Sequence, residues 1–180
     1  MSCKVASVGN DYKIIEITLT PNADPSTTLQ ITTDAIVSGD IITNDKVALS
    51  NAMNTEEGSG IIKSVSVMNY EAGLSPSPFS TAMDIVIYDN LATDTLGLDS
   101  GDVFVLDQSN NTALNVRQIE IESTDYDVID AENTIATKDN LEIPIRATLG
   151  NSISFSLTAR EAVTYDSDNR VYLRFEIARD

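Results

Sequence analysis

The chain contains no histidine and no tryptophan, and it has one cysteine among its 180 residues. Without histidine it lacks the side chain that most often serves as general base and metal ligand, and no Ser-His-Asp or Cys-His arrangement can form. Cys3 alone can build neither a disulfide framework within the chain nor a zinc site. The lack of tryptophan weakens a carbohydrate-binding interpretation, although six tyrosines keep it open. These absences point away from an enzyme.

Positive charge and long apolar runs are also scarce. Lys and Arg number 11 against 28 Asp and Glu, which gives a formal net charge of -17. Such a surface repels nucleic acid and anionic membranes, and it favours solubility, cation binding or docking to basic surfaces. No stretch approaches the ~18 apolar residues of a membrane helix, and Met1 to Lys4 is not followed by the long apolar run of a secretory signal. We expect a protein that is made in a cytoplasm and stays there or is assembled there into something larger.

Hydrophobic residues make up 42% of the chain, enough for a packed core in one domain. Apolar and polar residues alternate with a period of two in several short segments, most regularly where Ile153, Phe155 and Leu157 alternate with serines. Turn signals recur about every ten residues, and no long helical pattern is present. The pattern predicts an all-β fold, specifically an antiparallel β-sandwich that is jelly-roll-like, with about eight to eleven short strands.

Residues 58–89 are the expected centre of this fold. Strands at 61–68 and 82–89 are predicted to form a hairpin-like pair, joined by a loop that is long for a tight hairpin. Lys63 interrupts the apolar face that Ile61, Val65 and Val67 share. Pro21 is expected to end the first strand, which starts near Lys13.

Three later segments carry more specific expectations. The continuous apolar run at 103–106 predicts a strand buried on both faces. A change of apolar parity within 114–122 predicts a bulge, or a strand in two pieces. Pro144 predicts that the strand around it lies at a sheet edge or turns its nitrogen outward.

The domain organisation has two options. A boundary near residue 57 would make residues 1–57 an N-terminal arm or accessory hairpin, packed on a β-sandwich core of residues 58–180. Alternatively, residues 1–180 form one single domain, as the chain length allows.

Oxygen-rich loops are the weak metal candidates of the sequence. One holds Asp125, Asp127, Asp130 and Glu132, and another lies at 166–169. Calcium takes about six to eight oxygen ligands, but neither loop has the spacing of a helix-loop-helix calcium site. Asp and Asn are favoured in solvated turns in any case. We therefore expect no metal and no cofactor.

Other charged residues give weaker signals. A pair of carboxylates suited to glycoside hydrolysis is expected by chance in so acidic a chain. Near the C-terminus, Arg160, Arg174 and Arg179 accompany Glu161 and Glu176, which predicts ion pairs across strands or between subunits.

Several segments between residue 58 and the C-terminus, in this order, resemble a group of small β-rich virion structural proteins of tailed bacteriophages. They are GSGIIKSV at 58–65, DIVIYD at 84–89, ATKDNL at 136–141 with IPI at 143–145, LTAREAVTY at 157–165 and LRFEIARD at 173–180. The resemblance covers about two-thirds of the chain. It implies a non-enzymatic, capsid-associated protein, such as a capsid decoration, head-stabilising or head-fibre-base protein, and it implies no catalytic residue.

The resemblance also implies partners and a location. The partners would be the major capsid protein or other virion proteins, and the location the virion, assembled in the host cytoplasm. A homo-oligomer is expected, and a trimer is favoured because capsid lattices offer threefold sites.

Loops are where partner contacts concentrate, and two loops supply the candidates. The contact candidates are Tyr70, Leu74, Pro76, Pro78 and Phe79 in the 69–81 loop, and Tyr126 in the 125–132 loop. The alternative function is a carbohydrate- or host-surface-binding β-sandwich module, calcium-assisted or not, that uses the long loops and tyrosines. An enzyme is the third hypothesis.

Overall fold

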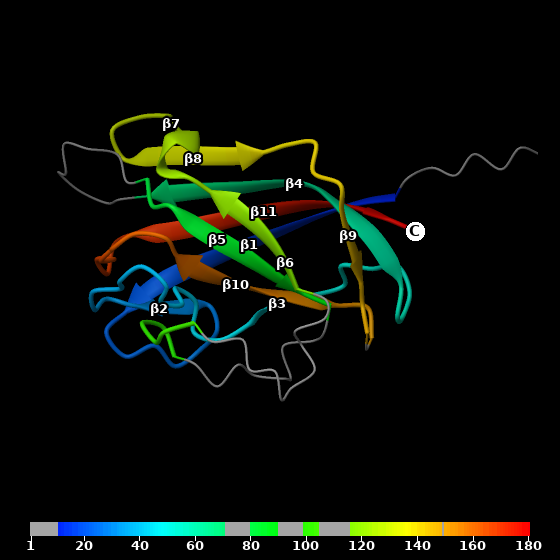
Figure 1. Cartoon of the computed structure of the whole chain (residues 1–180), viewed down its shortest axis with the longest axis horizontal. Helices are drawn as coiled ribbons and strands as arrows, with labels where there is room; N and C mark the ends of the chain where they lie inside the picture. The colour runs from blue at the N-terminus through cyan, green and yellow to red at the C-terminus, as the bar shows by residue number, and fades with distance from the viewer. Residues whose placement is uncertain (1–10, 71–79, 90–98, 105–115, 149) are drawn as a thin grey trace, which may run out of the picture.

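The structure is a computed structural model that describes residues 11–70, 80–89, 99–104, 116–148 and 150–180. In these residues the chain forms two packed β-sheets and one short 3-10 turn, η3 (Ser123–Asp125). Figure 1 shows the strands of the smaller sheet crossing those of the larger one. The predicted all-β sandwich is confirmed, and the eleven strands of the described residues match the expected number. The jelly-roll topology stays a prediction.

The larger sheet has seven strands in the order β2-β1-β11-β4-β8-β7, with β9 also pairing with β4. At its centre, β11 lies antiparallel between β1 and β4. Every second residue of β11 points into the core: Val171, Leu173, Phe175 and Ile177 are all buried. The strands are β1 (Asp11–Asn22), β2 (Gln30–Thr32), β4 (Ser59–Tyr70), β7 (Tyr126–Val128), β8 (Asn133–Lys138), β9 (Ile143–Arg146) and β11 (Arg170–Arg179).

The smaller sheet has four strands in the order β3-β10-β5-β6. They are β3 (Val47–Leu49), β5 (Met83–Tyr88), β6 (Val116–Ile121) and β10 (Ile153–Ala159). All seven residues of β10 are buried, although Ser154 and Ser156 alternate with its apolar side chains. Ser156 shares a 2.8 Å hydrogen bond with the buried hydroxyl of Tyr88, and the buried Lys46 lies over the Tyr88 ring. The face of β10 that carries the serines is therefore covered as well.

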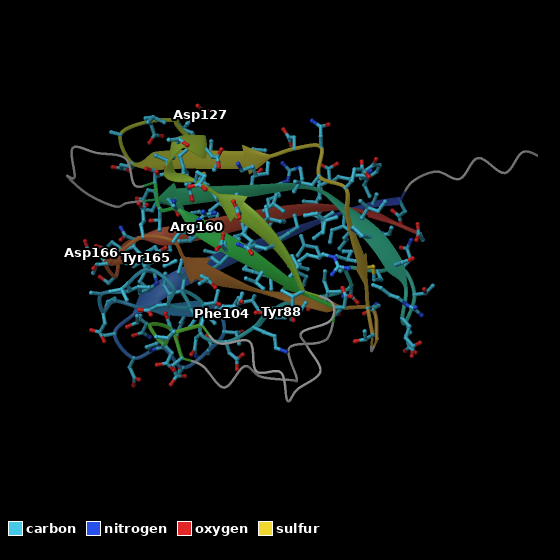
Figure 2. All side chains as sticks on the ribbon, in the orientation of Figure 1. Tyr88, Phe104, Asp127, Arg160, Tyr165 and Asp166 are labelled. Atoms are coloured by element: carbon cyan, nitrogen blue, oxygen red, sulfur yellow. The ribbon has the colours of Figure 1, made fainter. Side chains whose placement is uncertain are left out.

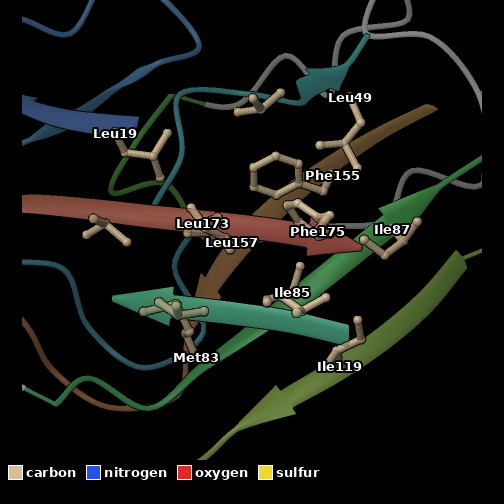
Figure 3. Close-up of a cluster of buried hydrophobic side chains, with 14 of the residues drawn as sticks. Leu19, Leu49, Met83, Ile85, Ile87, Ile119, Phe155, Leu157, Leu173 and Phe175 are labelled. Carbon is tan, nitrogen blue, oxygen red and sulfur yellow. The ribbon is translucent and has the colours of Figure 1, made fainter. Parts of the chain in front are cut away.

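The hydrophobic core lies between the two sheets (Figure 3). Phe155 of β10 and Phe175 of β11 meet there, with ring centroids 5.1 Å apart and the rings tilted by 49°. Ile85 and Ile119 of the smaller sheet and Leu19 of the larger one extend the same cluster. Full burial of one such side chain contributes about 1.5–3 kcal/mol, so these contacts across the sheets hold the sandwich together.

The expected hairpin of residues 61–68 and 82–89 is wrong, because β4 and β5 lie in different sheets. The neighbours of β4 are β11, β8 and β9, whereas β5 pairs with β10 and β6. The connection that looked long for a hairpin instead joins the two layers, as connections in sandwiches commonly do.

Lys63 is the extra residue of a β-bulge, which explains the broken apolar face. Ser64 pairs with Glu176 and Ile62 with Ile177, so Lys63 has no partner residue on β11. Because a bulge shifts the alternation by one residue, Ile62 is buried while Ile61 is only half-buried on the opposite face. The predicted grouping of Ile61 with Val65 was therefore wrong.

The expectations for residues 103–106 and 114–122 also differ from the structure. Val103 forms only an isolated bridge with Asp40 and is 65% exposed, so a strand buried on both faces does not begin there; residues 105 and 106 lie outside the described residues. The strand β6 pairs with β5 in unbroken register from Val116 to Ile121, which leaves neither a bulge nor a break in that part of the 114–122 segment.

Pro144 and Pro21 lie where the sheet does not need the N–H that proline lacks. Pro144 lies in β9, which pairs only with β4 among the described strands, so the predicted edge position is confirmed. Pro21 does not end the first strand, because β1 stops pairing with β11 at Leu19 and continues beside β2 to Asn22. At that point the nitrogen of Pro21 needs no partner on β11.

Candidate functional site

The four predicted acidic residues of the 125–132 loop serve different purposes. Asp125 lies 2.5 Å from Lys138 and accepts the backbone N–H of Glu122 at 2.7 Å. The hydrogen bond from Lys138 is the main reason why the pKa of Asp125 is lowered, and the bond from the N–H of Glu122 is the second. The negative charge of Asp125 is therefore balanced by Lys138 within the fold.

Asp130 shapes a turn. Its carboxylate accepts the backbone N–H groups of Glu132 and Asn133, each at 2.9 Å, and the side-chain amide of Asn133. These bonds lower the pKa of Asp130, as expected for an Asp that replaces a backbone acceptor in a tight turn.

Asp127 and Glu132 are exposed, and Figure 2 shows Asp127 at the margin of the molecule on β7. Across the described ranges, no group of three or more Asp, Glu, His or Cys is placed to hold a metal ion. The structure thus leaves the four carboxylates of the weak metal candidate without a common centre. The other oxygen-rich loop forms a turn, in which Asn169 accepts the N–H of Asp166 at 2.7 Å.

Of the partner-contact candidates, Tyr126 packs against the core of the protein. Its hydroxyl donates to the carbonyl of Thr81 at 3.0 Å, its ring packs against the core, and burial raises its pKa. Tyr70 is half-buried at the end of β4, opposite Asn133 and Arg170. Leu74, Pro76, Pro78 and Phe79 lie outside the described residues, so contacts through the 69–81 loop stay a prediction.

Arg160 is the centre of a charge cluster on the smaller sheet (Figure 2). Its guanidinium lies 3.0 Å from Glu120, 3.1 Å from Glu122 and 3.4 Å from Asp84. Arg179 similarly pairs with Asp11 of β1 at 2.5 Å. The ion pairs predicted across strands are confirmed for these two arginines, although their acidic partners differ from the glutamates nearest in sequence.

The outer face of the larger sheet carries an apolar row. Tyr172, Met68 and Ile135 are neighbours across β11, β4 and β8, and each is half-buried although it points away from the core. Together with Glu16 and Arg174, they line a groove of about 420 Å³. We call these three side chains the outer-face row. Half-buried apolar side chains on an open sheet face are a surface that a partner can cover.

A cleft of about 720 Å³ lies where β4 and β9 meet the end of β5. Asp89 in its wall is 9% exposed, and among the described residues its carboxylate accepts a long hydrogen bond, 3.4 Å, from the N–H of Arg146. Burial raises the pKa of Asp89, while that bond and the charge of Arg117 act in the opposite direction. At the rim, the Ser59 hydroxyl donates to the Asp180 carboxylate. The cleft thus combines a buried acid with two arginines.

Sequence reasoning missed both the outer-face row and Asp89. Met68 has the opposite parity to Val65 and Val67, and this could have placed it on the outer face. Ile135 gave no signal because β8 was not expected as a strand. Asp89 directly follows a buried strand, but no pattern distinguishes it from an ordinary strand-ending aspartate.

No protein-family model and no curated protein sequence matches the chain. In the described residues, no helix has the length and apolar character needed to cross a membrane. Among solved structures, the chain is similar to that of Desmodium yellow mottle tymovirus, with 12% identity over 98% of this chain and 86% of that one, at a TM-score of 0.24.

Two further virus structures are similar, each at a TM-score of 0.30. For Israeli acute paralysis virus, as a full particle heated to 63 degrees, identity is 9% over 94% of this chain and 71% of that chain, at a TM-score of 0.30. For sacbrood virus of honeybee, identity is 8% over 94% and 70% of the two chains, also at 0.30. TM-scores this low do not establish a shared fold, so function is inferred from the protein's own residues.

Proposed function

We propose that the protein is a non-enzymatic structural component of a bacteriophage virion, acting as a capsid decoration, head-stabilising or head-fibre-base protein. The observation that carries the proposal is the outer-face row of Tyr172, Met68 and Ile135, three apolar side chains that lie side by side on the sheet face turned away from the core and line a groove. The resemblance of residues 58–180 to β-rich virion proteins of tailed phages supports the same role.

The acidic surface favours docking to a basic partner. With a net charge of -17, the surface is attracted to basic protein surfaces, and complementary charge speeds encounter and fixes orientation. A groove of about 420 Å³ offers a modest contact. On a capsid, however, many copies act together, and avidity multiplies weak individual contacts.

The proposed partner is the major capsid protein or another virion protein, and the proposed assembly is a homotrimer at threefold positions of the lattice. Light scattering of the purified protein measures the mass of the assembly, and hence the number of copies in it. A mass three times that of the 19.4 kDa chain supports the trimer, and a mass of one chain at micromolar concentration contradicts it.

The decisive experiment locates the protein in purified virions by mass spectrometry and electron microscopy. We expect it at a fixed ratio to the major capsid protein, and its absence from intact particles would overturn the proposed function. A binding assay on capsids that lack the protein then tests the surface. Replacing both Met68 and Ile135 with Lys should weaken capsid binding at least tenfold.

The matched control is Ala23→Lys, which adds the same kind of charge at an exposed position outside the groove and should leave binding unchanged. All variants must keep the wild-type Tm for the comparison to hold. Equal binding by the double variant and the wild type would mean that the outer-face row is not the contact. A glycan array, run with and without calcium, tests the carbohydrate-binding alternative on the same samples.

A further inference from the structure

Among the described strands, β7 forms an edge of the larger sheet. In the described part of the chain, β7 pairs only with β8, and no strand lies on its other side. Two apolar residues at this edge face water: Val128 is 63% exposed and Ile129 is 55% exposed. An edge strand that presents unpaired backbone groups is a template for another strand.

The hydrogen-bond pattern identifies which backbone groups are available. The N–H of Ile129 donates to the carbonyl of Asn133 at 2.9 Å, and the register continues with Val128 opposite Thr134 and Asp127 opposite Ile135. In antiparallel strands, bonded and non-bonded pairs alternate. The N–H and C=O of Asp127 therefore bond to β8. Those of Val128 point away from β8, to the side where an additional strand would lie.

The side chains at this edge also alternate. Tyr126 packs against the core, so Val128, two residues further, lies on the same face of the strand, and Asp127 lies on the outer face. A strand added beside β7 would place side chains next to Val128 and Asp127 in turn. Apolar side chains match Val128, and Lys or Arg matches the exposed carboxylate of Asp127.

Charge decides which strand fits. Asp127 and Glu132 are exposed at this edge, while the nearby Lys138 is already paired with Asp125. A second copy that paired at this edge would bring the same carboxylates next to Asp127 and Glu132, and like charges directly opposite each other are destabilising. The edge therefore discourages pairing between copies and remains open to a basic strand.

We propose that the free edge of β7 binds an extended, basic segment of a different polypeptide by strand addition, with an apolar residue beside Val128 and Lys or Arg beside Asp127. Main-chain hydrogen bonds to Val128 provide affinity, and the alternate side chains provide selectivity. This surface is separate from the outer-face row, and the proposal holds whether or not the protein belongs to a virion.

The test uses the full chain and three synthetic peptides of equal length: alternating Val and Lys, alternating Val and Glu, and the Val-Lys peptide with N-methylated backbone amides. Fluorescence anisotropy at low salt gives the dissociation constants. We expect the Val-Lys peptide to bind at least tenfold more tightly than the Val-Glu peptide. The N-methylated peptide should bind at least tenfold more weakly than its parent, because it cannot donate ladder hydrogen bonds.

Two variants locate the contact. Val128→Pro removes the outward N–H without touching a bond to β8, and should weaken Val-Lys binding at least tenfold while the Tm stays within a few degrees. Asp127→Lys should weaken it at least fivefold and reduce its salt dependence. If the proline variant does not fold, the N-methylated peptide still tests the backbone contact.

Three results would each overturn the proposal. The Val-Lys and Val-Glu peptides could bind equally well, or N-methylation could leave binding unchanged. Alternatively, light scattering could show that the wild-type chain associates with itself and that Val128→Pro abolishes this association. That last result would identify a second copy, and not a basic partner, as the occupant of the edge.

Discussion

Asp89 shows how a single residue can work against the stability of the fold that holds it. It is 9% exposed, the one hydrogen bond that its carboxylate accepts from the described residues is long, and burial raises its pKa. A raised pKa means that the native state binds the proton more tightly than the unfolded chain. Stability is therefore lost as the pH rises from the unfolded pKa, about 3.9 for Asp, through the folded pKa, and the full cost is present above it.

Replacing Asp89 with Asn should accordingly raise the Tm at pH 7, and the gain should disappear as the pH approaches 3. A change of about 1 kcal/mol shifts the Tm of a protein of this size by about 2–4 °C, so calorimetry across pH can resolve it. Asp139→Asn, at an exposed position, is the control and should have little effect. A lower Tm for Asp89→Asn at pH 7 would show that its contacts outweigh its burial.

Gly60 is needed where two strands approach closely. A Cβ on this residue would lie 2.8 Å from the backbone carbonyl oxygen of Ala178 on β11, which cannot move without shifting the strand. We expect Gly60→Ala to lower the free energy of unfolding by about 1–3 kcal/mol, measured by urea titration. Ser64→Ala on the same strand is the control, with a change of about 0.5 kcal/mol or less. Equal effects of the two substitutions would contradict this account.

At the scale of elements, the packing of β10 on β11 centres on two aromatic rings. Phe155 and Phe175 are fully buried, with centroids 5.1 Å apart. Each Phe→Ala change should cost about 3–5 kcal/mol. In a double-mutant cycle the pair should show a coupling of about 0.5–1.5 kcal/mol, measured by denaturant unfolding. Additive effects would mean that each ring packs against the opposite sheet independently of the other.

The same elements show what the sequence could and could not predict. The strands at 153–159 and 171–177 were predictable because their alternation meets a core on one side. The pairing of β4 was not, since its partners lie far away along the chain and the bulge at Lys63 hides the register. Asn133 to Lys138 also went unnoticed, because only Thr134 and Ala136 of that strand are buried and neither is a large apolar residue.

For the candidate sites, sequence reasoning identified the acidic loop but not its use. Nothing in the sequence shows that Asp125 faces Lys138, or that Asp130 closes its own turn, because both depend on the β7-β8 pairing. The apolar residues that carry the proposed surfaces, Met68, Ile135 and Val128, become visible only once the strands are assigned to a face and an edge.

At the scale of the whole molecule, residues 11–57 contribute to both sheets. The strand β1 pairs with β11 over nine residue positions, from Asp11 to Leu19, and β3 lies beside β10. Ile31, Ile36, Ile42 and Leu49 are fully buried in the common core. Of the two domain options, we propose the single domain.

A chain that begins at residue 58 should then lack a cooperative thermal transition, because deletion leaves one side of β11 and of β10 without partners. Circular dichroism and hydrogen exchange on residues 58–180 provide the measurement, with the full chain as the reference. A cooperative unfolding transition with native-like protection in the truncated chain would support the arm and core instead.

The central position of β11 has a consequence for biosynthesis. Asp11 and Arg179, which pair across β1 and β11, are 168 positions apart in the chain. At synthesis rates of about 5–20 residues per second, β1 waits roughly 10 to 30 s after leaving the ribosome before its partner strand appears. During that interval β1 and β4 lack the strand that joins them, so the larger sheet can close only after β11 has been synthesised. Until then, the edges of β1 and β4 that face β11 in the folded protein lack their partner, and such unpaired strand edges are prone to aggregation.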